Sequence, residues 1–233
     1  MMITRSISAF IVMIAMAGSV LALEVNITPE RDKVQVIHGD GLVKIQRIQD
    51  QNHTIEGGFA KTSRKCPPFC IEPMEVAPGV RTVGELELMD FMEQKLPGEE
   101  GLVIDARVTS WHLRGTIPGS INIPFTTFEL KPDDPKLIEA LRTLGGKPRS
   151  DVSGITRSLE GMGLMGGDEK TDFWDFTRAK ELVLWCNGPW CGQSPRAINA
   201  LLKLGYPASK LNYYRGGMQM WQIFGLTTVV PKK

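Results

Sequence analysis

The chain has 233 residues, with 27 Lys and Arg against 26 Asp and Glu, and its formal net charge is +1. This length can bury a full hydrophobic core, so we expect one domain with added segments. The balanced charge excludes nucleic-acid binding driven by a basic surface, and the ordinary composition excludes a low-complexity chain.

The first 22 residues have the pattern of a secretory signal peptide. Residues 1–5 carry one positive charge, residues 6–20 are nearly all apolar or small, and small residues end the run at Ala22. We therefore expect cleavage after about Ala22, export to the periplasm, and no membrane insertion of the mature chain. An uncleaved membrane anchor is the alternative, because the apolar stretch approaches spanning length.

Residues 23–80 are expected to form an N-terminal hairpin followed by an arm. Alternating apolar residues at 33–38 and 42–47 flank a Gly-Asp-Gly turn, which is typical of a β-hairpin. The arm contains Cys66-Pro67-Pro68-Phe69-Cys70. In an exported protein this spacing predicts a structural disulfide between Cys66 and Cys70. Two alternatives are a redox shuttle that exchanges with a second cysteine pair, and a soft-metal site that includes Met74.

Zinc is not expected anywhere in the chain. The cysteine pairs lack the two-residue spacing of zinc knuckles, and the three histidines, His38, His53 and His112, are scattered. We therefore predict neither a metal ion nor a cofactor.

Residues 81–233 alternate between expected helices and strands, with a long insertion between them. Helices are expected from a capping box at 82–85 to about Lys95, at 135–144, at 193–202 and up to Trp221, and strands at 102–104, 121–123, 181–185 and 211–214. Residues 147–177 are polar and glycine-rich without a sustained period, so we expect a surface insertion. The alternation predicts an α/β fold with a mostly parallel sheet and helices on both faces.

Cys186 is the most informative residue for function. It follows the apolar run at 181–185 and opens a loop that leads into the helix at 193. Ligands bind at the carboxyl ends of strands in such sheets, so this position predicts a site. The free amides of the first helical turn and the helix dipole favour an anion there. We therefore expect Cys186 to be a reactive thiolate.

Residues 82–230 resemble a rhodanese-type domain. Three signatures carry this resemblance in the right order: Leu102-Val103-Ile104-Asp105-Ala106-Arg107 with the segment 115–124, the Cys186 strand with its loop and helix, and Arg215-Gly216-Gly217-Met218-Gln219-Met220-Trp221. The resemblance implies a rhodanese-like α/β fold and a sulfurtransferase. It places the sulfur-carrying cysteine at Cys186, which would take sulfane sulfur from a small donor as a persulfide and pass it to a thiol acceptor.

The resemblance also assigns roles around Cys186. Backbone amides of the loop would surround the sulfur. Arg107 would either hold Asp105 near the site or form a structural ion pair that shapes the loop, and Trp221 is expected in the core. The loop residues implied for substrate binding are Asn187, Gly188, Pro189, Trp190, Gly192, Gln193 and Ser194.

Several positions depart from the family pattern. The loop is about two residues longer than usual, and it contains no Lys or Arg before Ser194. Arg196 is therefore the nearest candidate to receive an anionic donor, with plain solvated surface as the alternative. Trp111 and Thr116 stand where the family usually has an acidic residue and a histidine. These changes argue against standard thiosulfate chemistry.

Cys191 leaves three functions open. As a second thiol in the loop, it could resolve a Cys186 persulfide or close a disulfide, or it could simply pack beside Trp190. We expect sulfur transfer first. The alternatives are a thiol–disulfide oxidoreductase that uses Cys186 and Cys191 with a periplasmic redox partner protein, and a non-catalytic binding module that docks a partner on the insertion at 147–177.

Overall fold

The computed structural model describes residues 24–149, 152–162, 164, 170–171 and 173–231. The expected signal peptide lies outside the described residues, so its cleavage and the export of the protein stay predictions. Within the described part of the chain, no helix is both long and apolar enough to cross a membrane.

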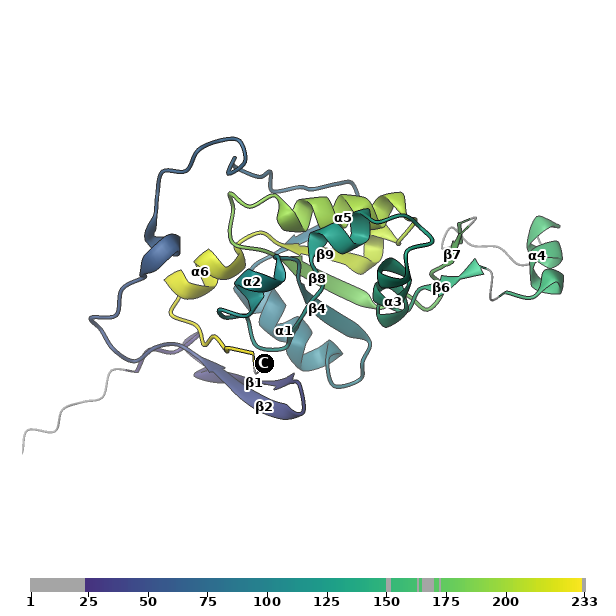
Figure 1. Ribbon diagram of the computed structural model, residues 1–233. Helices are drawn as coiled ribbons and strands as arrows, with labels where there is room; N and C mark the ends of the chain where they lie inside the picture. The colour runs from purple at the N-terminus through teal and green to yellow at the C-terminus, as the bar shows by residue number, and fades with distance from the viewer. Residues whose placement is uncertain (1–23, 150–151, 163, 165–169, 172, 232–233) are drawn as a thin grey trace, which may run out of the picture.

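Five parallel strands form the central sheet in the order β3-β9-β8-β4-β5 (Figure 1). The strands are β3 (Arg81–Val83), β4 (Gly101–Asp105), β5 (Ser120–Asn122), β8 (Glu181–Trp185) and β9 (Leu211–Tyr214). The predicted parallel sheet is confirmed, and β8, the strand before Cys186, is its middle strand. Parallel strands have the same direction, so their carboxyl ends share one edge of the sheet.

Helices cover both faces of this sheet, as the sequence predicts. One face carries α1 (Glu85–Lys95) and α6 (Gly217–Ile223), and the other carries α3 (Pro135–Thr143) and α5 (Gln193–Lys203). The chain also forms the short helix α2 (Thr109–His112) and three 3-10 turns, Gly57–Ala60, Phe125–Glu129 and Ala208–Lys210.

The capping box predicted at 82–85 is wrong. Thr82 lies in β3, and Gly84 caps α1 instead, with its backbone N–H donating to Glu87 Oε2 across 3.0 Å.

Alternate residues of β8 build two hydrophobic cores. Leu182 and Leu184 point into the core shared with α3 and α5, whereas Val183 and Trp185 point into the core shared with α1 and α6. All four side chains are buried. Because each such side chain contributes about 1.5–3 kcal/mol, the middle strand is held firmly on both faces. Cys186 therefore starts from a rigid support.

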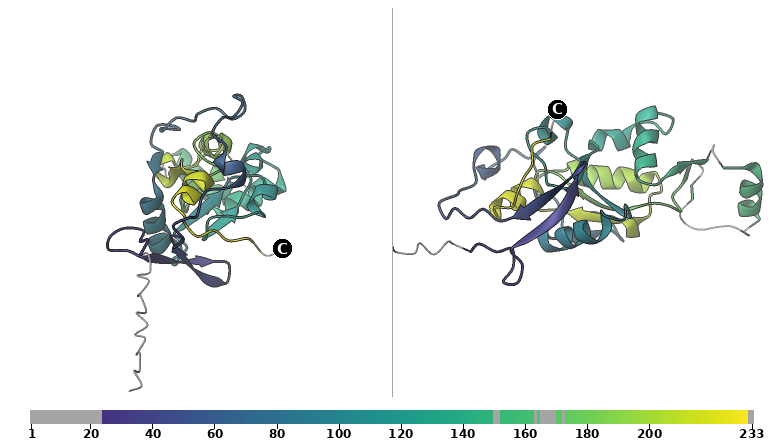
Figure 2. Two further views of the ribbon diagram at one scale, coloured as in Figure 1. Left: turned by 90° about the vertical axis from the view of Figure 1, so that its left-hand side faces the viewer. Right: turned by 90° about the horizontal axis from the view of Figure 1, so that it is seen from below.

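The N-terminal residues fold as predicted, into the antiparallel hairpin of β1 (Lys33–His38) and β2 (Gly41–Gln46). Val34, Val36 and Ile45 are buried in the core that holds α1 and α6. The chain then runs across the molecule through a segment that we call the arm, residues 57–75. The arm passes around α6 and over the end of α5 (Figures 1 and 2).

The described residues of the insertion contain more regular structure than the sequence predicts. Residues 147–148 (β6) pair antiparallel with 174–175 (β7), and α4 (Gly154–Gly161) is capped by the Ser153 side chain, which accepts from Thr156 N. Trp174 and Phe176 anchor the base of the insertion in the core. The α4 helix projects away from the central sheet (Figures 1 and 2).

Candidate active site

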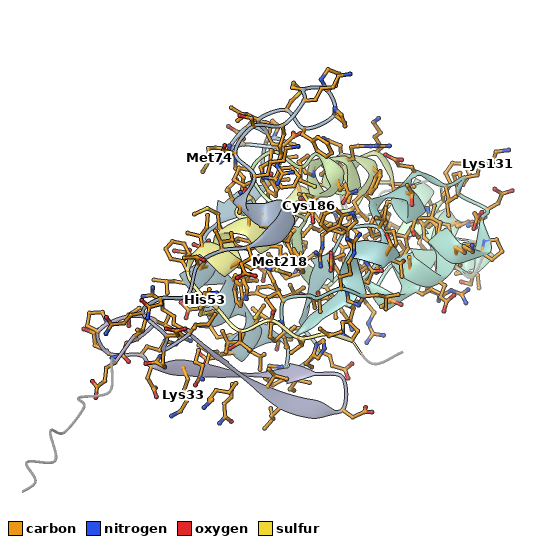
Figure 3. All side chains as sticks on the ribbon, turned by 60° about the vertical axis from the view of Figure 1, so that its left-hand side comes forward. Lys33, His53, Met74, Lys131, Cys186 and Met218 are labelled. Carbon is orange, nitrogen blue, oxygen red and sulfur yellow. A yellow bond between two sulfur atoms is a disulfide. The ribbon has the colours of Figure 1, made fainter. Side chains whose placement is uncertain are left out.

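Cys186 lies directly after β8 at the carboxyl edge of the sheet. Its backbone carbonyl accepts a hydrogen bond from Met218 N across 3.0 Å, and the carbonyl of Asn187 accepts from Gln219 N, also across 3.0 Å. Figure 3 labels Cys186 and Met218 in this region. The start of α6 is thus joined to the start of the loop, and the two signatures separated in sequence form one site.

Gly217 makes this junction possible. Its φ is +54°, and a Cβ atom there would lie 2.3 Å from the Cys186 carbonyl oxygen and 2.7 Å from Gly188 N. Real side chains are not found at such distances, and the conformation itself favours glycine. Gly217 of the third signature is therefore explained by backbone contact with the cysteine loop, whereas a Cβ at Gly216 would meet the side chains of Met220, Tyr214 and Glu85.

The two loop thiols contact each other and are largely hidden from solvent. Cys186 is 2% exposed and Cys191 is 5% exposed, and both are free of disulfides. The Cys186 thiol lies 2.8 Å from the Cys191 carbonyl oxygen and also within hydrogen-bond reach of the Cys191 sulfur. Ser194 Oγ donates to the Cys186 sulfur across 3.0 Å.

The negative charge of the pair rests on Cys191. Burial raises the pKa of Cys186 well above its usual value, and the nearby Cys191 raises it further. The pKa of Cys191 is lowered to about 7, first by the hydrogen bond from Cys186 and then by the backbone N–H groups of Asn187 and Gln193. The expectation that Cys186 is the resting thiolate is wrong, because its burial outweighs the donors that helix α5 offers.

Asp105 and Arg107 form a buried ion pair beside β8. Arg107 donates to Asp105 from Nε across 2.8 Å and from a terminal nitrogen across 2.6 Å. His112 Nδ1 and Thr116 Oγ1 each lie 3.0 Å from Asp105 Oδ2. Burial raises the pKa of Asp105, but the hydrogen bonds from Arg107 and His112 outweigh this effect, so its pKa is below the usual value.

This ion pair lies against Trp185, the residue that precedes the cysteine loop. The Arg107 guanidinium lies 4.5 Å from the centre of the Trp185 ring, next to Cys186, and donates to the Gly115 carbonyl across 2.7 Å. Arg107 holds Asp105, and this ion pair is compatible with both roles expected for Arg107. Thr116, which departs from the family pattern, is accommodated as a donor to the same carboxylate.

Arg196 does not serve the loop in this structure. It forms a two-pronged ion pair with Glu129 (2.9 and 2.8 Å) and lies 4.3 Å from the Phe125 ring centre, while 57% of its side chain is exposed. Its charge is already matched, so the alternative of a surface residue describes it.

The arm covers the cysteine loop, which the sequence does not predict. Arg64 lies 3.6 Å from the centre of the Trp190 ring, and Phe69 packs edge-on against the same ring at 5.6 Å. Glu72 N donates to the Pro189 carbonyl across 2.8 Å, and Glu72 Oε1 lies close to Gly192. The arm therefore packs against the residues on both sides of Cys191.

Further hydrogen bonds join the loop and the arm to the start of α6. Arg215 donates from two nitrogens to the Glu72 carbonyl (3.0 and 2.8 Å), and Trp190 Nε1 donates to Gln219 Oε1. Within the described chain, Asn187 Oδ1, Gln193 Oε1 and the Tyr213 hydroxyl are buried without a hydrogen-bond partner. Two loop acceptors are thus available to a substrate that carries N–H or O–H donors.

The structure has the two arm cysteines bonded to each other, and that this bond persists in the protein's own compartment stays a prediction. Cys66 and Cys70 form a disulfide with their Cα atoms 4.7 Å apart. Among the described residues, no three His, Cys, Asp or Glu side chains gather in a way that could hold a metal ion.

Comparisons with known proteins agree with this fold. The model of the rhodanese-like domain family matches residues 87–223. No curated protein matches the chain. Among solved structures, the human single-domain sulfurtransferase TSTD1 is 20% identical, with 62% of this chain and 96% of that chain covered and a TM-score of 0.35.

Two other solved structures are similar at the same level. A rhodanese-related protein from Thermoplasma volcanium is 18% identical, covering 65% of this chain and 99% of its own, with a TM-score of 0.35. The As-Sb reductase from Leishmania major is 22% identical, covering 62% of this chain and 79% of its own, with a TM-score of 0.36. On the family match over more than half of its length, this chain belongs to the rhodanese-like domain family.

Proposed function

We propose that this protein is a sulfurtransferase that moves sulfane sulfur through a persulfide on Cys186. Family membership supports the reaction class. The observation that carries the proposal is the thiol pair at the carboxyl edge of the sheet, with Cys186 at the position of the family's sulfur carrier and Cys191 in contact with it. Export to the periplasm, a small sulfane donor and a thiol acceptor belong to the same proposal.

In this proposal Cys191 accepts a proton and Cys186 is the nucleophile. Cys191 rests as the thiolate and lies within reach of the Cys186 proton. When that proton moves to Cys191, Cys186 becomes the thiolate, and its higher pKa makes it the stronger nucleophile. Ser194 Oγ, 3.0 Å from the Cys186 sulfur, would stabilise the charge as it forms.

The sulfur then moves in two balanced displacements. The Cys186 thiolate attacks the sulfane sulfur of the donor, a sulfur–sulfur bond forms, and the rest of the donor leaves with the electron pair of the bond that breaks. A thiolate acceptor next attacks the outer sulfur of the persulfide, and Cys186 leaves as a thiolate. Cys191 and Cys186 then share one proton again.

The surroundings favour donors other than thiosulfate. Arg196 is paired with Glu129, and the loop offers the acceptors Asn187 Oδ1 and Gln193 Oε1 rather than cationic side chains. A donor with N–H or O–H groups, such as the persulfide of a small thiol, suits these acceptors better than a dianion does.

Turnover with defined reagents tests the proposal. Reduced full-length protein is mixed with glutathione persulfide, which carries N–H donors, as sulfur donor and cyanide as acceptor, and thiocyanate is measured. We expect Cys186→Ser to abolish turnover and Cys191→Ser to slow it, because the latter removes the proton acceptor. Arg196→Ala is the matched control and should retain the wild-type rate. Unchanged turnover in Cys186→Ser would falsify the proposal.

A thiol–disulfide oxidoreductase is the second candidate, because the two loop sulfurs are in contact. A redox titration of the Cys186/Cys191 pair separates the two functions. A reversible disulfide near the potential of the compartment supports the oxidoreductase, whereas thiols that stay reduced throughout exclude it. A non-catalytic binding module stays a prediction, to be tested by partner capture with Cys186→Ala.

A further inference from the structure

The two cysteine pairs differ sharply in their access to solvent. Cys66 is exposed and Cys70 is half-buried, whereas Cys186 and Cys191 are 2% and 5% exposed. A redox protein can therefore meet the arm pair directly, whereas the loop pair is far less accessible to a partner of that size. Any oxidation of the loop thiols to a disulfide would block sulfur transfer until electrons arrived.

The arm contacts the residues on both sides of Cys191. Phe69 packs on Trp190, which precedes Cys191, and Glu72 Oε1 lies close to Gly192, which follows it. Cys70 lies between Phe69 and Glu72 in the chain. Cys70, the half-buried member of the arm pair, therefore lies in the stretch of arm that contacts the neighbours of Cys191, whereas Cys66 is exposed.

We propose that the Cys66/Cys70 pair is the electron entry point of the buried Cys186/Cys191 pair, so that the arm reduces a loop disulfide by thiol–disulfide exchange. This activity goes beyond sulfur transfer and does not depend on it. In the structure, Cys66 and Cys70 are joined by a disulfide, while Cys186 and Cys191 are free thiols.

The exchange proceeds in two steps that conserve atoms and electrons. The Cys70 thiolate attacks the Cys191 sulfur of the loop disulfide, and Cys186 leaves as a thiolate that takes up a proton. The Cys66 thiolate then attacks the Cys70 sulfur of the mixed disulfide, and Cys191 leaves as a thiolate. Two electrons have moved from the arm to the loop, and an external dithiol reduces the Cys66–Cys70 disulfide for the next cycle.

The loop environment suits this order of events. A thiol with a low pKa is the better leaving group in an exchange, and the pKa of Cys191 is lowered to about 7, which favours the second step, in which Cys191 leaves the mixed disulfide. In the first step the attack falls on the Cys191 sulfur because the arm contacts the residues on both sides of Cys191. Cys186, the more deeply buried thiol, never has to meet the arm, because only Cys191 forms the mixed disulfide. Cys66, at the surface, is free to react with a dithiol from outside.

A trapping experiment tests whether Cys70 lies within reach of Cys191. The double variant Cys66→Ser/Cys186→Ser keeps Cys70 and Cys191, and the matched double variant Cys70→Ser/Cys186→Ser keeps Cys66 and Cys191. Both full-length proteins are equilibrated in a glutathione redox buffer at several dilutions, alkylated and mapped by peptide mass spectrometry. We expect an intramolecular Cys70–Cys191 disulfide in the first variant, at least about tenfold more than the Cys66–Cys191 disulfide in the second. Equal yields, or no Cys70–Cys191 bond, overturn the proposal.

A rate measurement covers the case in which a double variant folds poorly. The loop pair is oxidised in the wild-type protein and in Cys66→Ser/Cys70→Ser, and its reduction by dithiothreitol is followed by the same mapping. We expect reduction about tenfold slower without the arm cysteines. An equal or faster rate overturns the relay. Both readouts are disulfide maps, so they stand even if the protein transfers no sulfur.

Discussion

The Cys186 sulfur lies 2.8 Å from the backbone carbonyl oxygen of Cys191, close enough for the Cys186 thiol to donate its proton there. A carbonyl oxygen only accepts, so this contact stabilises the protonated form of Cys186, while the charge state of each thiol affects the pKa of the other. The two cysteines therefore act as one unit with a single mobile proton, and their behaviour with pH should be read as that of a pair.

Alkylation should report the charge on Cys191. In wild-type protein, we expect iodoacetamide to label Cys191 before Cys186, with the rate rising through about pH 7, where Cys191 ionises. Cys186→Ala should move this midpoint upward, because it removes the thiol whose hydrogen bond lowers the Cys191 pKa. Peptide mass spectrometry after short pulses measures both rates. Preferential labelling of Cys186 at neutral pH would contradict the assignment.

Removing the Asp105 charge should destabilise the fold strongly. Asp105→Asn leaves the buried Arg107 guanidinium without its anionic partner, and breaking a buried pair in this way costs about 3–5 kcal/mol. Urea denaturation measures the free energy of unfolding. Glu129→Gln, which breaks the exposed pair with Arg196, is the matched control, and we expect a loss of about 1 kcal/mol or less. If both variants lose a similar free energy of unfolding, the buried ion pair stabilises the fold no more than the exposed pair does.

The lowered pKa of Asp105 predicts that the free energy of unfolding decreases at acidic pH. The folded pKa of Asp105 lies below its usual value of 3.8, so the folded state favours the ionised form. The stabilisation is fully present above that usual value and is lost as the pH falls through the lower folded pKa. Unfolding free energies measured from pH 6 downward should fall less steeply in Asp105→Asn than in wild type. Parallel curves would refute the link.

The arm should control access to the loop thiols. Phe69→Ala removes the edge-on contact with Trp190, so we expect the arm to lift more often and alkylation of Cys191 to become several-fold faster. Ile71→Ala is the matched control, because Ile71 is 86% exposed, whereas Phe69 is 43% exposed. The pulse-labelling rate of Cys191 is the readout. If both variants react like wild type, the arm does not limit access.

Gly217 should be far less tolerant of a side chain than Gly225. Both have positive φ, at +54° and +63°, so alanine at either site costs about 1–2 kcal/mol in backbone strain. A Cβ at Gly217 also meets the Cys186 carbonyl oxygen at 2.3 Å, whereas the nearest atom at Gly225 is 3.5 Å away. We expect Gly217→Ala to lose sulfur transfer and Gly225→Ala to keep it, as measured by thiocyanate formation at matched folded fractions.

Much of the fold follows from local patterns in the sequence. The apolar run before Cys186 and the amphipathic helix after it are recognisable without a structure, because burial on both faces of a strand and on one face of a helix leaves a periodic trace. The start of α1 was misplaced, because Gly84 caps the helix through its backbone and leaves no side-chain signal at that position.

The parts that could not be predicted depend on contacts between distant segments. The pKa of Cys186 is set by burial beneath the arm and against α6, and no local pattern encodes that burial. The contact between Phe69 and Trp190 likewise has no local sequence pattern, because the two residues are 121 positions apart in the chain. Ser194 and Arg107 were found from the family pattern, but their hydrogen bonds required the structure.

The location of the transferred sulfur tests the account most directly. Reduced wild-type protein, Cys186→Ser and Cys191→Ser are incubated with glutathione persulfide, freed of donor, alkylated and mapped by peptide mass spectrometry. The account predicts one extra sulfur atom on Cys186 in wild type, the same adduct formed more slowly in Cys191→Ser, and no adduct in Cys186→Ser. An adduct on Cys191 that survives Cys186→Ser, or no adduct on any of the three proteins, would contradict it.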